Sequence, residues 1–327
     1  MTALLGPLLT LALVLHIGAA VGEAQSARMV RVGFLSSTSA AAAGGRVDAL
    51  RAGLRELGYV EGQNLRIEYR WADGDDARLP ALAGELVRLG VDVIVTQGTP
   101  PTLAAKRGTE KIPIVFVGAG DAVAARLVNS LREPGVNVTG LTSIAPDLAA
   151  KRLELLKQAM PDVRRVIVLA NPTNTVSKTE VPHTTAAAHA RGLAVDLREA
   201  RDPAELAAAF AAMRPERGAA VVVLSDLMFF AQRALIRQLA VKNGLPLMAW
   251  TDEFVDAGAL MSYGPNVVEM HRRAAVFVDR IVKGADPAKY PVEQPARFDL
   301  VVNLRNAGSL GLTLPRAVVL RADRVIQ

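Results

Sequence analysis

The chain has 327 residues, of which 51% are hydrophobic and 4% aromatic, with no cysteine and a formal net charge of +6. This length allows a full hydrophobic core and favours two domains. The absence of cysteine excludes disulfides, thiolate nucleophiles, cysteine metal sites and lipid attachment to an N-terminal cysteine. The basic residues form no long Lys/Arg block, so we expect no nucleic-acid partner.

Residues 4–21 form an apolar run that is followed at once by the polar sequence GEAQ. Small residues fit a cleavage site after Ala24, with a second option after Ala20. The pattern predicts a secretory signal peptide over residues 1–24, although its first residues carry no Lys or Arg. The alternative is an uncleaved membrane anchor, because the run is just long enough to span a bilayer. In either case we expect the folded part outside the cytoplasm.

From residue 29 onward, short apolar runs alternate with amphipathic stretches, which is typical of an α/β fold with parallel strands. Several amphipathic stretches carry an apolar residue every three or four positions and end at a glycine, as helices do. In the first half of the chain, the apolar runs predict strands over residues 29–35, 65–71, 91–95, 114–117 and 136–141.

Residues 114–144 form the most informative segment of this half. A buried strand at 114–117 is followed by Gly118 and Gly120, which allow a sharp turn, and by Asp121, which we expect to cap a helix. The helix is predicted from an apolar face and ends at a Pro-Gly pair. The segment is therefore interpreted as a strand–helix–strand unit whose loop opens at the carboxyl end of a strand, where open α/β sheets bind ligands. The apolar face consists of Val123, Leu127, Val128 and Leu131.

The second half repeats the alternation, so the chain is predicted to form two similar α/β halves. After a long helix that runs from Asn266 to Lys283, a further strand and a short helix complete the chain. This tail is too short for a third domain, and we expect it to supply one element to each half. The strands of this half are predicted over residues 166–169, 194–197, 220–224, 246–249, 259–263 and 297–303. A first helix is predicted through Leu153, Leu156 and Met160, and further helices over 183–191, 204–213, 231–243 and 304–310.

Three segments carry a family resemblance: YRWADGDDARLPALAGELVRLGVDVIVTQGT at 69–99, GDAVAARLVNSLREPGVNVTGLT at 120–142, and the stretch 261–315. In this order and spacing they resemble extracytoplasmic substrate-binding proteins of ABC transporters with a type I periplasmic-binding fold, in the branch for amino-acid-like solutes. The resemblance spans nearly the whole mature chain. One departure is Ala122, which stands where family members usually carry proline.

The resemblance implies two Rossmann-like lobes with parallel sheets, joined by a three-stranded hinge near residues 139–143, 263–265 and 295–298. It implies that a small polar ligand, an amino acid or related organic acid, is captured in the cleft between the lobes and delivered to an ABC permease with its cytoplasmic ATPase. Lobe 1 is expected to comprise residues 28–141 plus 265–295, and lobe 2 residues 142–264 plus 296–327.

The same resemblance places the protein in the periplasm or another extracytoplasmic space. We expect a monomer that meets the membrane only through the permease, or through the signal segment if that remains uncleaved. We expect no cofactor and no metal ion.

In lobe 1 the candidate ligand contacts lie in the loops at the carboxyl ends of strands. Each group precedes a helix, so free amides and hydroxyls can bind the anionic end of a ligand. For each residue alone, ordinary helix capping is the alternative. The residues are Ser36, Ser37, Thr38, Gln97, Gly98, Thr99 and Asp121.

In lobe 2 an acid in the cleft is suited to a ligand ammonium group, which favours Asp226 or Asp252. The alternative for Asp226 is a cap on the helix that begins near Leu227. Trp250 and Tyr263 can stack on an apolar ligand body, with core packing as the alternative. The candidates of this lobe are Asn171, Thr173, Asp226, Asp252 and Tyr263, with Ser225 and Trp250 beside them.

Enzyme signatures are incomplete. The Gly118-x-Gly120 pair begins like a dinucleotide-binding fingerprint, but Val123 occupies the position that needs a small residue. His183 and His189 are six residues apart and do not share a helical face, and His271 is expected on a solvated face. Two alternatives to transport remain: a sensor that presents its ligand to a membrane receptor, and an α/β enzyme with a nucleotide cofactor. The export signal argues against the enzyme.

Overall fold

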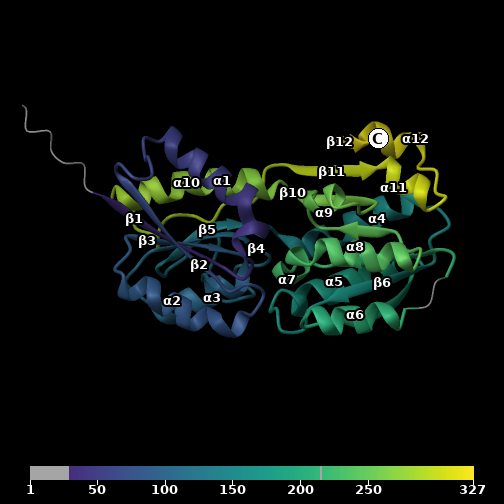
Figure 1. Ribbon diagram of the computed structural model, residues 1–327, viewed down its shortest axis with the longest axis horizontal. Helices are drawn as coiled ribbons and strands as arrows, with labels where there is room; N and C mark the ends of the chain where they lie inside the picture. The colour runs from purple at the N-terminus through teal and green to yellow at the C-terminus, as the bar shows by residue number, and fades with distance from the viewer. Residues whose placement is uncertain (1–28, 214–215) are drawn as a thin grey trace, which may run out of the picture.

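The computed structural model describes residues 29–213 and 216–327, so the predicted signal peptide lies outside the described residues. Two α/β lobes lie side by side along the long axis of the molecule (Figure 1). Each lobe has its own sheet, and the predicted α/β class is confirmed. Within the described ranges, no helix has both the length and the apolar character needed to cross a membrane.

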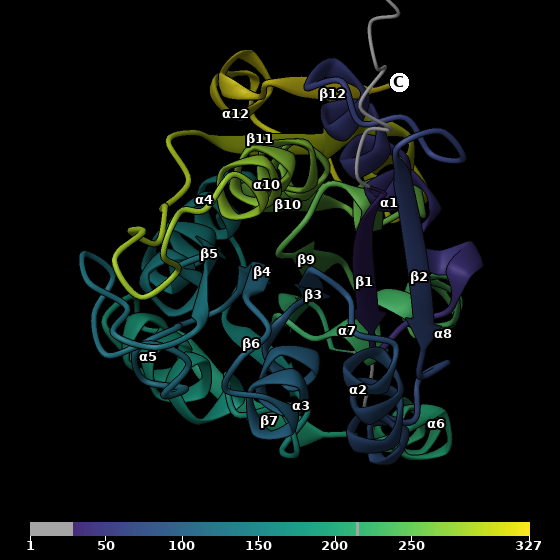
Figure 2. The ribbon, with the colours of Figure 1, turned by 90° about the vertical axis from the view of Figure 1, so that its left-hand side faces the viewer.

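Lobe 1 contains a five-stranded parallel sheet in the order β2-β1-β3-β4-β5. Its strands are buried on both faces: Val93 and Val95 contact one core, whereas Ile94 contacts the other. Helices α1 and α10 cover one face of the sheet, and α2 and α3 cover the other (Figure 2). The elements are β1 (Val30–Ser36), α1 (Ala40–Glu56), β2 (Leu65–Trp71), η1 (Asp76–Arg78), α2 (Leu79–Arg88), β3 (Val93–Gln97), α3 (Thr99–Gly108), β4 (Ile114–Ala119), β5 (Val138–Thr142) and α10 (Val267–Val282).

Lobe 2 contains a seven-stranded sheet in the order β12-β11-β10-β9-β8-β6-β7, in which β10 and β11 are antiparallel and the other pairs are parallel. Helices α6 to α9 pack on one face, and α4, α5, α11 and α12 pack on the other. The elements are η2 (Ala145–Leu148), α4 (Ala149–Ala159), β6 (Arg165–Ala170), α5 (Ser177–His189), β7 (Ala194–Glu199), α6 (Pro203–Ala211), β8 (Ala219–Val223), α7 (Leu227–Ala231), α8 (Arg233–Lys242), β9 (Leu247–Ala249), α9 (Glu253–Asp256), β10 (Met261–Pro265), β11 (Phe298–Asn303), α11 (Leu304–Ser309), α12 (Arg316–Arg321) and β12 (Arg324–Ile326).

The chain passes between the two sheets three times. It leaves lobe 1 after β5, returns from β10 into α10, and enters β11 after a stretch that pairs with the end of β5. In that stretch the Glu293 amide donates to the Gly140 carbonyl at 2.9 Å, and the Thr142 amide donates to the Glu293 carbonyl at 3.0 Å. At the first passage Ile144 has φ of 45°, a left-handed conformation that β-branched residues rarely adopt.

The helix predicted after Asp121 is wrong: residues 121–131 form turns and no helix. Arg126 has φ of 56°, which interrupts any helical turn, and its carbonyl accepts from Lys106 Nζ at 2.6 Å. Farther along, the Leu131 carbonyl accepts from the Val292 amide at 2.8 Å. One local bond of helical spacing forms, from the Ala125 amide to the Asp121 carbonyl at 3.0 Å, but the bonds to distant parts of the chain hold the rest of the segment, so tertiary structure overrides the periodic pattern here.

Candidate ligand-binding site

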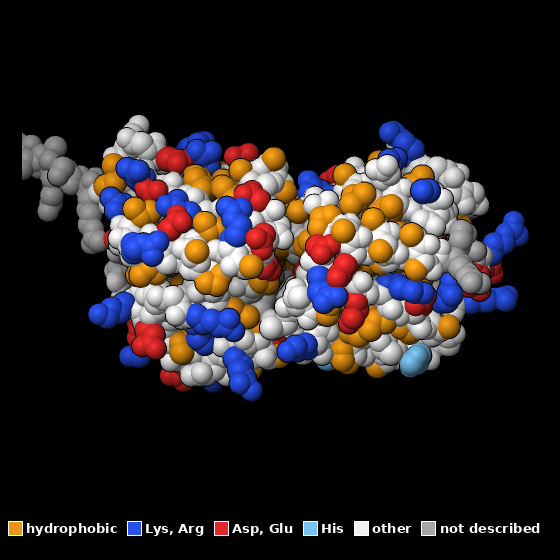
Figure 3. Space-filling view, turned by 60° about the horizontal axis from the view of Figure 1, so that its bottom comes forward, with side chains coloured by type: hydrophobic (Ala, Val, Ile, Leu, Met, Phe, Trp, Pro, Cys, Tyr) orange, Lys and Arg blue, Asp and Glu red, His pale blue; other side chains and the backbone are white. Residues whose placement is uncertain are grey.

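A small cavity lies between the two lobes. A groove separates the lobes on the surface of the molecule (Figure 3). The volume of the cavity is about 30 Å³, room for one or two water molecules, whereas ligand pockets usually span roughly 300–1,000 Å³. The lobes are therefore in close contact around this cavity, and we call this arrangement the closed form. Lobe 1 lines the cavity with Arg46, Gln97, Gly98, Thr99, Gly118 and Gly120, and lobe 2 with Asn174, Val176, Ser225, Asp226, Leu227 and Trp250.

Two glycines allow this close approach of the lobes. A Cβ atom on Gly120 would lie 2.6 Å from Cγ1 of Val176 in the other lobe. A Cβ atom on Gly98 would lie 2.9 Å from Cδ1 of Leu227. The glycine at position 120 therefore favours the closed form by leaving room for Val176, and Gly98 is required chiefly by its left-handed φ of 78°.

The wall from lobe 1 is built on the carboxyl end of β3. The Gln97 side chain is buried and is held through Oε1, which accepts from Ser36 Oγ at 3.1 Å. The Ser36 and Thr38 hydroxyls are bonded to each other at 3.0 Å. Gln97 Nε2 has no hydrogen-bond partner among the described residues, so this wall presents a free donor.

The wall from lobe 2 is built on Asp226, the N-cap of α7. One carboxylate oxygen accepts from the Phe229 amide at 2.9 Å, and the other accepts from Asn171 Nδ2 at 3.1 Å and Asn174 Nδ2 at 3.0 Å. Burial raises the pKa of Asp226 to about 6, and the three hydrogen bonds oppose that shift. Asp226 thus caps a helix, as the alternative interpretation predicted, and it also lines the cavity; its contact with a ligand ammonium group stays a prediction.

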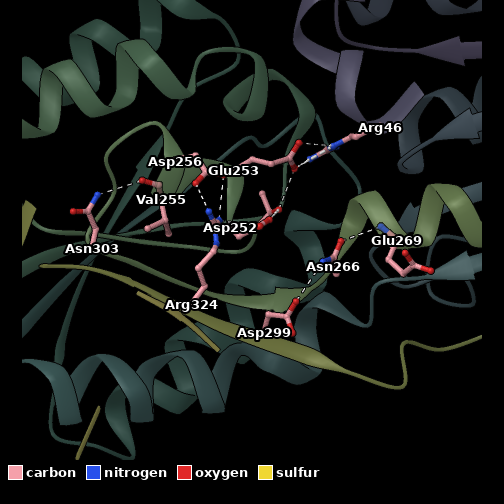
Figure 4. A network of polar contacts seen from close by, with 11 residues as sticks. Arg46, Asp252, Glu253, Val255, Asp256, Asn266, Glu269, Asp299, Asn303 and Arg324 are labelled. Carbon is pink, nitrogen blue, oxygen red and sulfur yellow. Dashed lines mark hydrogen bonds and ion pairs between the residues drawn. The ribbon is translucent and has the colours of Figure 1, made fainter. Parts of the chain in front are cut away.

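Arg46 reaches the cavity from α1 and contacts lobe 2 directly. Its side chain is 1% exposed, and Nη2 lies 2.5 Å from Glu253 Oε2 (Figure 4). The guanidinium carbon lies 3.7 Å from the ring centroid of Phe230 and 5.6 Å from that of Trp250. This buried cation therefore has a carboxylate and two aromatic rings as partners, all from the other lobe.

His271 is fully buried on α10, so the predicted solvated position is wrong. Its Nδ1 donates to the Val267 carbonyl at 2.7 Å. Burial, and then the charge of Arg46, lower the pKa of His271 to about 3. The residue lies one turn after Val267, which lines the cavity, and its place on that inward face of the helix explains its burial.

Of the residues predicted from the sequence, the structure brings Gln97, Gly98, Thr99 and Asp226 together on the cavity wall. Four other predicted residues do not line the cavity but support the residues that do. Ser36 bonds to Gln97 and to Thr38. Asn171 bonds to Asp226, and Thr173 Oγ1 donates to Asn171 Oδ1 at 2.7 Å. Ser37 is buried beside Ser36 and Thr38 at the end of β1.

Three predicted residues lie away from the cavity lining. Asp121 is half-exposed, and its carboxylate accepts from the amides of Val123 and Ala124 at 3.1 and 2.9 Å. Asp252 pairs with Arg324 at 3.1 Å. The Tyr263 ring packs against Phe298, with centroids 6.0 Å apart. These residues serve local structure in the closed form.

The sequence interpretation missed Arg46 and Asn174. Arg46 lies on the buried stripe of α1 together with Ala43, Leu50 and Leu54, and this placement was the available signal. Asn174 is next to the predicted Thr173 in the loop after β6, which the sequence did identify as a cleft loop. Within the described part of the chain, no group of three His, Cys, Asp or Glu side chains is placed to hold a metal ion.

Known proteins are similar to this chain over most of its length. The sequence profile of the family described as ABC transporter substrate binding protein matches residues 32–326. A tyrosine-binding protein of Clostridioides difficile (strain R20291) is 25% identical over 250 residues, covering 76% of this chain and 72% of its own length.

Two solved structures are also similar to this chain. Each match covers 91% of this chain and 100% of the other chain. The crystal structure of an ABC domain in complex with L-Trp from Streptococcus pneumonia has a TM-score of 0.85 at 26% identity. A ligand-free, open structure of a substrate-binding protein with adhesive properties from Clostridium difficile has a TM-score of 0.66 at 24% identity. With two parallel-sheet lobes, a cleft between them and a family match along nearly all of its length, the chain belongs to the ABC transporter substrate binding protein family.

Proposed function

We propose that this substrate-binding protein captures an amino acid with an aromatic side chain and that Asp226 binds its ammonium group. The observation that carries the proposal is the buried Asp226 carboxylate on the cavity wall, held by Asn171 and Asn174. A carboxylate in this position suits a cationic group, because a paired charge offsets the cost of burial. The tyrosine-binding relative and the similar L-Trp complex support the aromatic class of ligand.

The three passages of the chain between the lobes would form the hinge of this capture. We propose that lobe 1 comprises residues 28–141 plus 265–295, and lobe 2 residues 142–264 plus 296–327. A few residues at the ends of β5, β10 and the 293–298 stretch would absorb the dihedral changes of opening and closing. The closed form would then pass the amino acid to an ABC permease that is driven by a cytoplasmic ATPase.

The same proposal makes the protein a monomer that works outside the cytoplasm, exported by the signal segment at 1–24, and not an enzyme. It would meet the membrane through its permease, or through the signal segment if that is retained. Its family of substrate-binding proteins supports this placement.

The test is isothermal titration calorimetry of the mature chain with a panel of L-amino acids, D-amino acids, sugars and polyols. We expect L-tryptophan or L-tyrosine to bind. An Asp226→Ser variant keeps a helix cap but removes the charge, and its affinity should fall by about 10-fold to 100-fold, as expected for a lost charged hydrogen bond.

Asp202→Asn is the matched control, because Asp202 caps α6 on the exposed surface, with 2.8 Å bonds to the amides of Ala204 and Glu205. Its affinity should equal that of the wild type. Binding of polyols but no amino acid would reject the proposed ligand class, and equal affinities of the wild type and Asp226→Ser would reject the role of Asp226.

A further inference from the structure

Arg46 stands out among the residues of the cavity because it is a buried cation whose carboxylate partner belongs to the opposite lobe. Its Nε lies 3.2 Å from both Glu253 oxygens, and Nη2 lies 2.5 Å from Oε2 (Figure 4). The Glu253 side chain is 20% exposed and also accepts from Thr251 Oγ1 at 3.1 Å. When the lobes separate, Arg46 and Glu253 move apart, and the guanidinium is then left without this carboxylate.

Two further donors line the same cavity. Gln97 is 1% exposed and Trp250 is 6% exposed, and neither Gln97 Nε2 nor Trp250 Nε1 has an acceptor among the described residues. A buried donor without an acceptor costs roughly 1–3 kcal/mol, and native structures contain few of them. Together with Arg46, which can only donate, they place three donor side chains on this cavity.

We infer that Arg46, Gln97 and Trp250 form a subsite for the carboxylate of the ligand. A carboxylate offers about four lone-pair positions and fits the guanidinium fork in the way that Glu253 does in the closed form. Glu253 thus marks the kind of group that Arg46 binds, and the ligand carboxylate takes its place when the lobes close around the ligand. This inference rests on the proposed function and deepens it.

The subsite defines the ligand class and its orientation. The carboxylate lies at the donor group and the ammonium lies at Asp226, which would repel a second anion. A free α-carboxylate therefore becomes a requirement, so esters, amides, decarboxylated amines and polyols should bind weakly. Arg46 is the specificity-determining residue because it carries the only formal positive charge among the described residues that line the cavity.

The experiment compares L-tryptophan and L-tyrosine with tryptamine and tyramine, which lack the carboxylate, by calorimetric titration of the wild type and Arg46→Gln. We expect Arg46→Gln to lose about tenfold or more in affinity for the amino acids and to bind the amines as the wild type does. Arg51→Gln is the matched control, because Arg51 lies on the same helix, pairs with Glu61 and is 45% exposed. Its affinities should be unchanged.

Two more variants keep the inference testable if Arg46→Gln folds poorly. Trp250→Phe keeps an aromatic ring but removes the Nε1 donor, and it should weaken the amino acids more than the amines. Glu253→Gln removes the group that competes for Arg46, so it should preserve or raise amino-acid affinity. If the Arg46–Glu253 pair served only to hold the lobes together, Glu253→Gln and Arg46→Gln would lower affinity equally, and that result would overturn the subsite.

The outcomes separate the two proposals. Suppose that the wild type binds an amino acid. If Arg46→Gln then lowers the affinities for the amino acids and for the amines equally, or changes neither affinity, the carboxylate subsite is wrong and the proposed function stands. If the wild type binds no amino acid, both are wrong.

Discussion

The two walls of the cleft differ in where their polar groups find partners. In lobe 2, the three donors to Asp226 come from the same lobe, and the neighbouring Ser225 is held by the buried Glu180. In lobe 1, Gln97 keeps a free donor, and Arg46 pairs with a residue of the other lobe. The Asp226 part of the lobe 2 wall is thus preorganised, although Trp250 Nε1 beside it has no acceptor among the described residues, whereas Arg46 of lobe 1 gains its carboxylate partner only when the lobes close. We therefore expect a ligand to dock on lobe 2 first.

The wall of lobe 2 is supported from behind by a buried ion pair between Arg152 and Glu180. Arg152 Nη1 lies 2.8 Å from Glu180 Oε1, with side chains 3% and 0% exposed, and Arg152 Nε donates to the Tyr263 carbonyl at 2.9 Å. This network joins the cleft loop at Ser225 to β10, the strand before the second passage. Burial lowers the pKa of Arg152, and the charge of Glu180 opposes that effect.

Glu180→Gln should therefore have the largest effect, because it leaves the Arg152 charge buried and unpaired. We expect a loss of about 3–5 kcal/mol in the free energy of unfolding, measured by urea denaturation. The exposed pair of Arg201 and Glu205 is the control, since solvent screens its charges and Glu205→Gln there should change the stability far less. Equal effects of the two variants would show that lobe 2 does not depend on this network.

The next effect is the pH dependence of ligand affinity. With a pKa of about 6 in the unliganded protein, Asp226 is ionised at pH 7.5 and protonated at pH 5. Only the ionised form pairs with an ammonium group, so affinity should fall by up to about tenfold per pH unit below pH 6. Titrations at pH 5, 6 and 7.5 measure this, with Asp226→Ser as the variant that should show no such fall.

The Asp226 carboxyl group should affect the stability of the unliganded protein with the opposite pH dependence. Its folded pKa is raised, so its contribution to stability is present at low pH and is lost as the pH rises through about 6. The charge of Asp76 in lobe 1 adds to the rise, although less than burial does. Stabilisation by ligand should therefore be largest at neutral pH, and a flat profile in the wild type would contradict the assignment of the ammonium to Asp226.

Much of the fold could be predicted from the sequence because buried parallel strands leave a clear local pattern. The strand predicted at 65–71 coincides with β2, and the one at 29–35 differs from β1 by one residue at each end. The pattern failed where distant bonds decide the local conformation. Residues 121–131 are periodic enough for a helix, but Lys106 and Val292 bind their carbonyls instead.

The site was predictable only in part, and for a related physical reason. Loops at the carboxyl ends of strands indicated Gln97, Gly98, Thr99 and Asp226, because topology alone brings these ends together. Arg46 was missed because a charged residue becomes buried only through a partner, and its partner Glu253 is 207 positions away in the sequence. The apolar stripe of the helix signals that Arg46 is buried, but no local pattern identifies its partner.

The smallest expected effect concerns the close contact of the two walls at Gly120. A Cβ atom there would lie 2.6 Å from Val176, so Gly120→Ala should disfavour the closed form by about 1 kcal/mol, which is about fivefold in ligand affinity. Small-angle X-ray scattering at one partly saturating ligand concentration should show a larger radius of gyration for the variant than for the wild type. Gly45→Ala is the control, because Gly45 is an exposed helical glycine where an added Cβ would meet no atom within 4 Å, and it should only stabilise α1. If Gly120→Ala scatters like the wild type, Val176 or the loop at Gly120 shifts to accommodate the methyl group, and closure does not depend on this glycine contact.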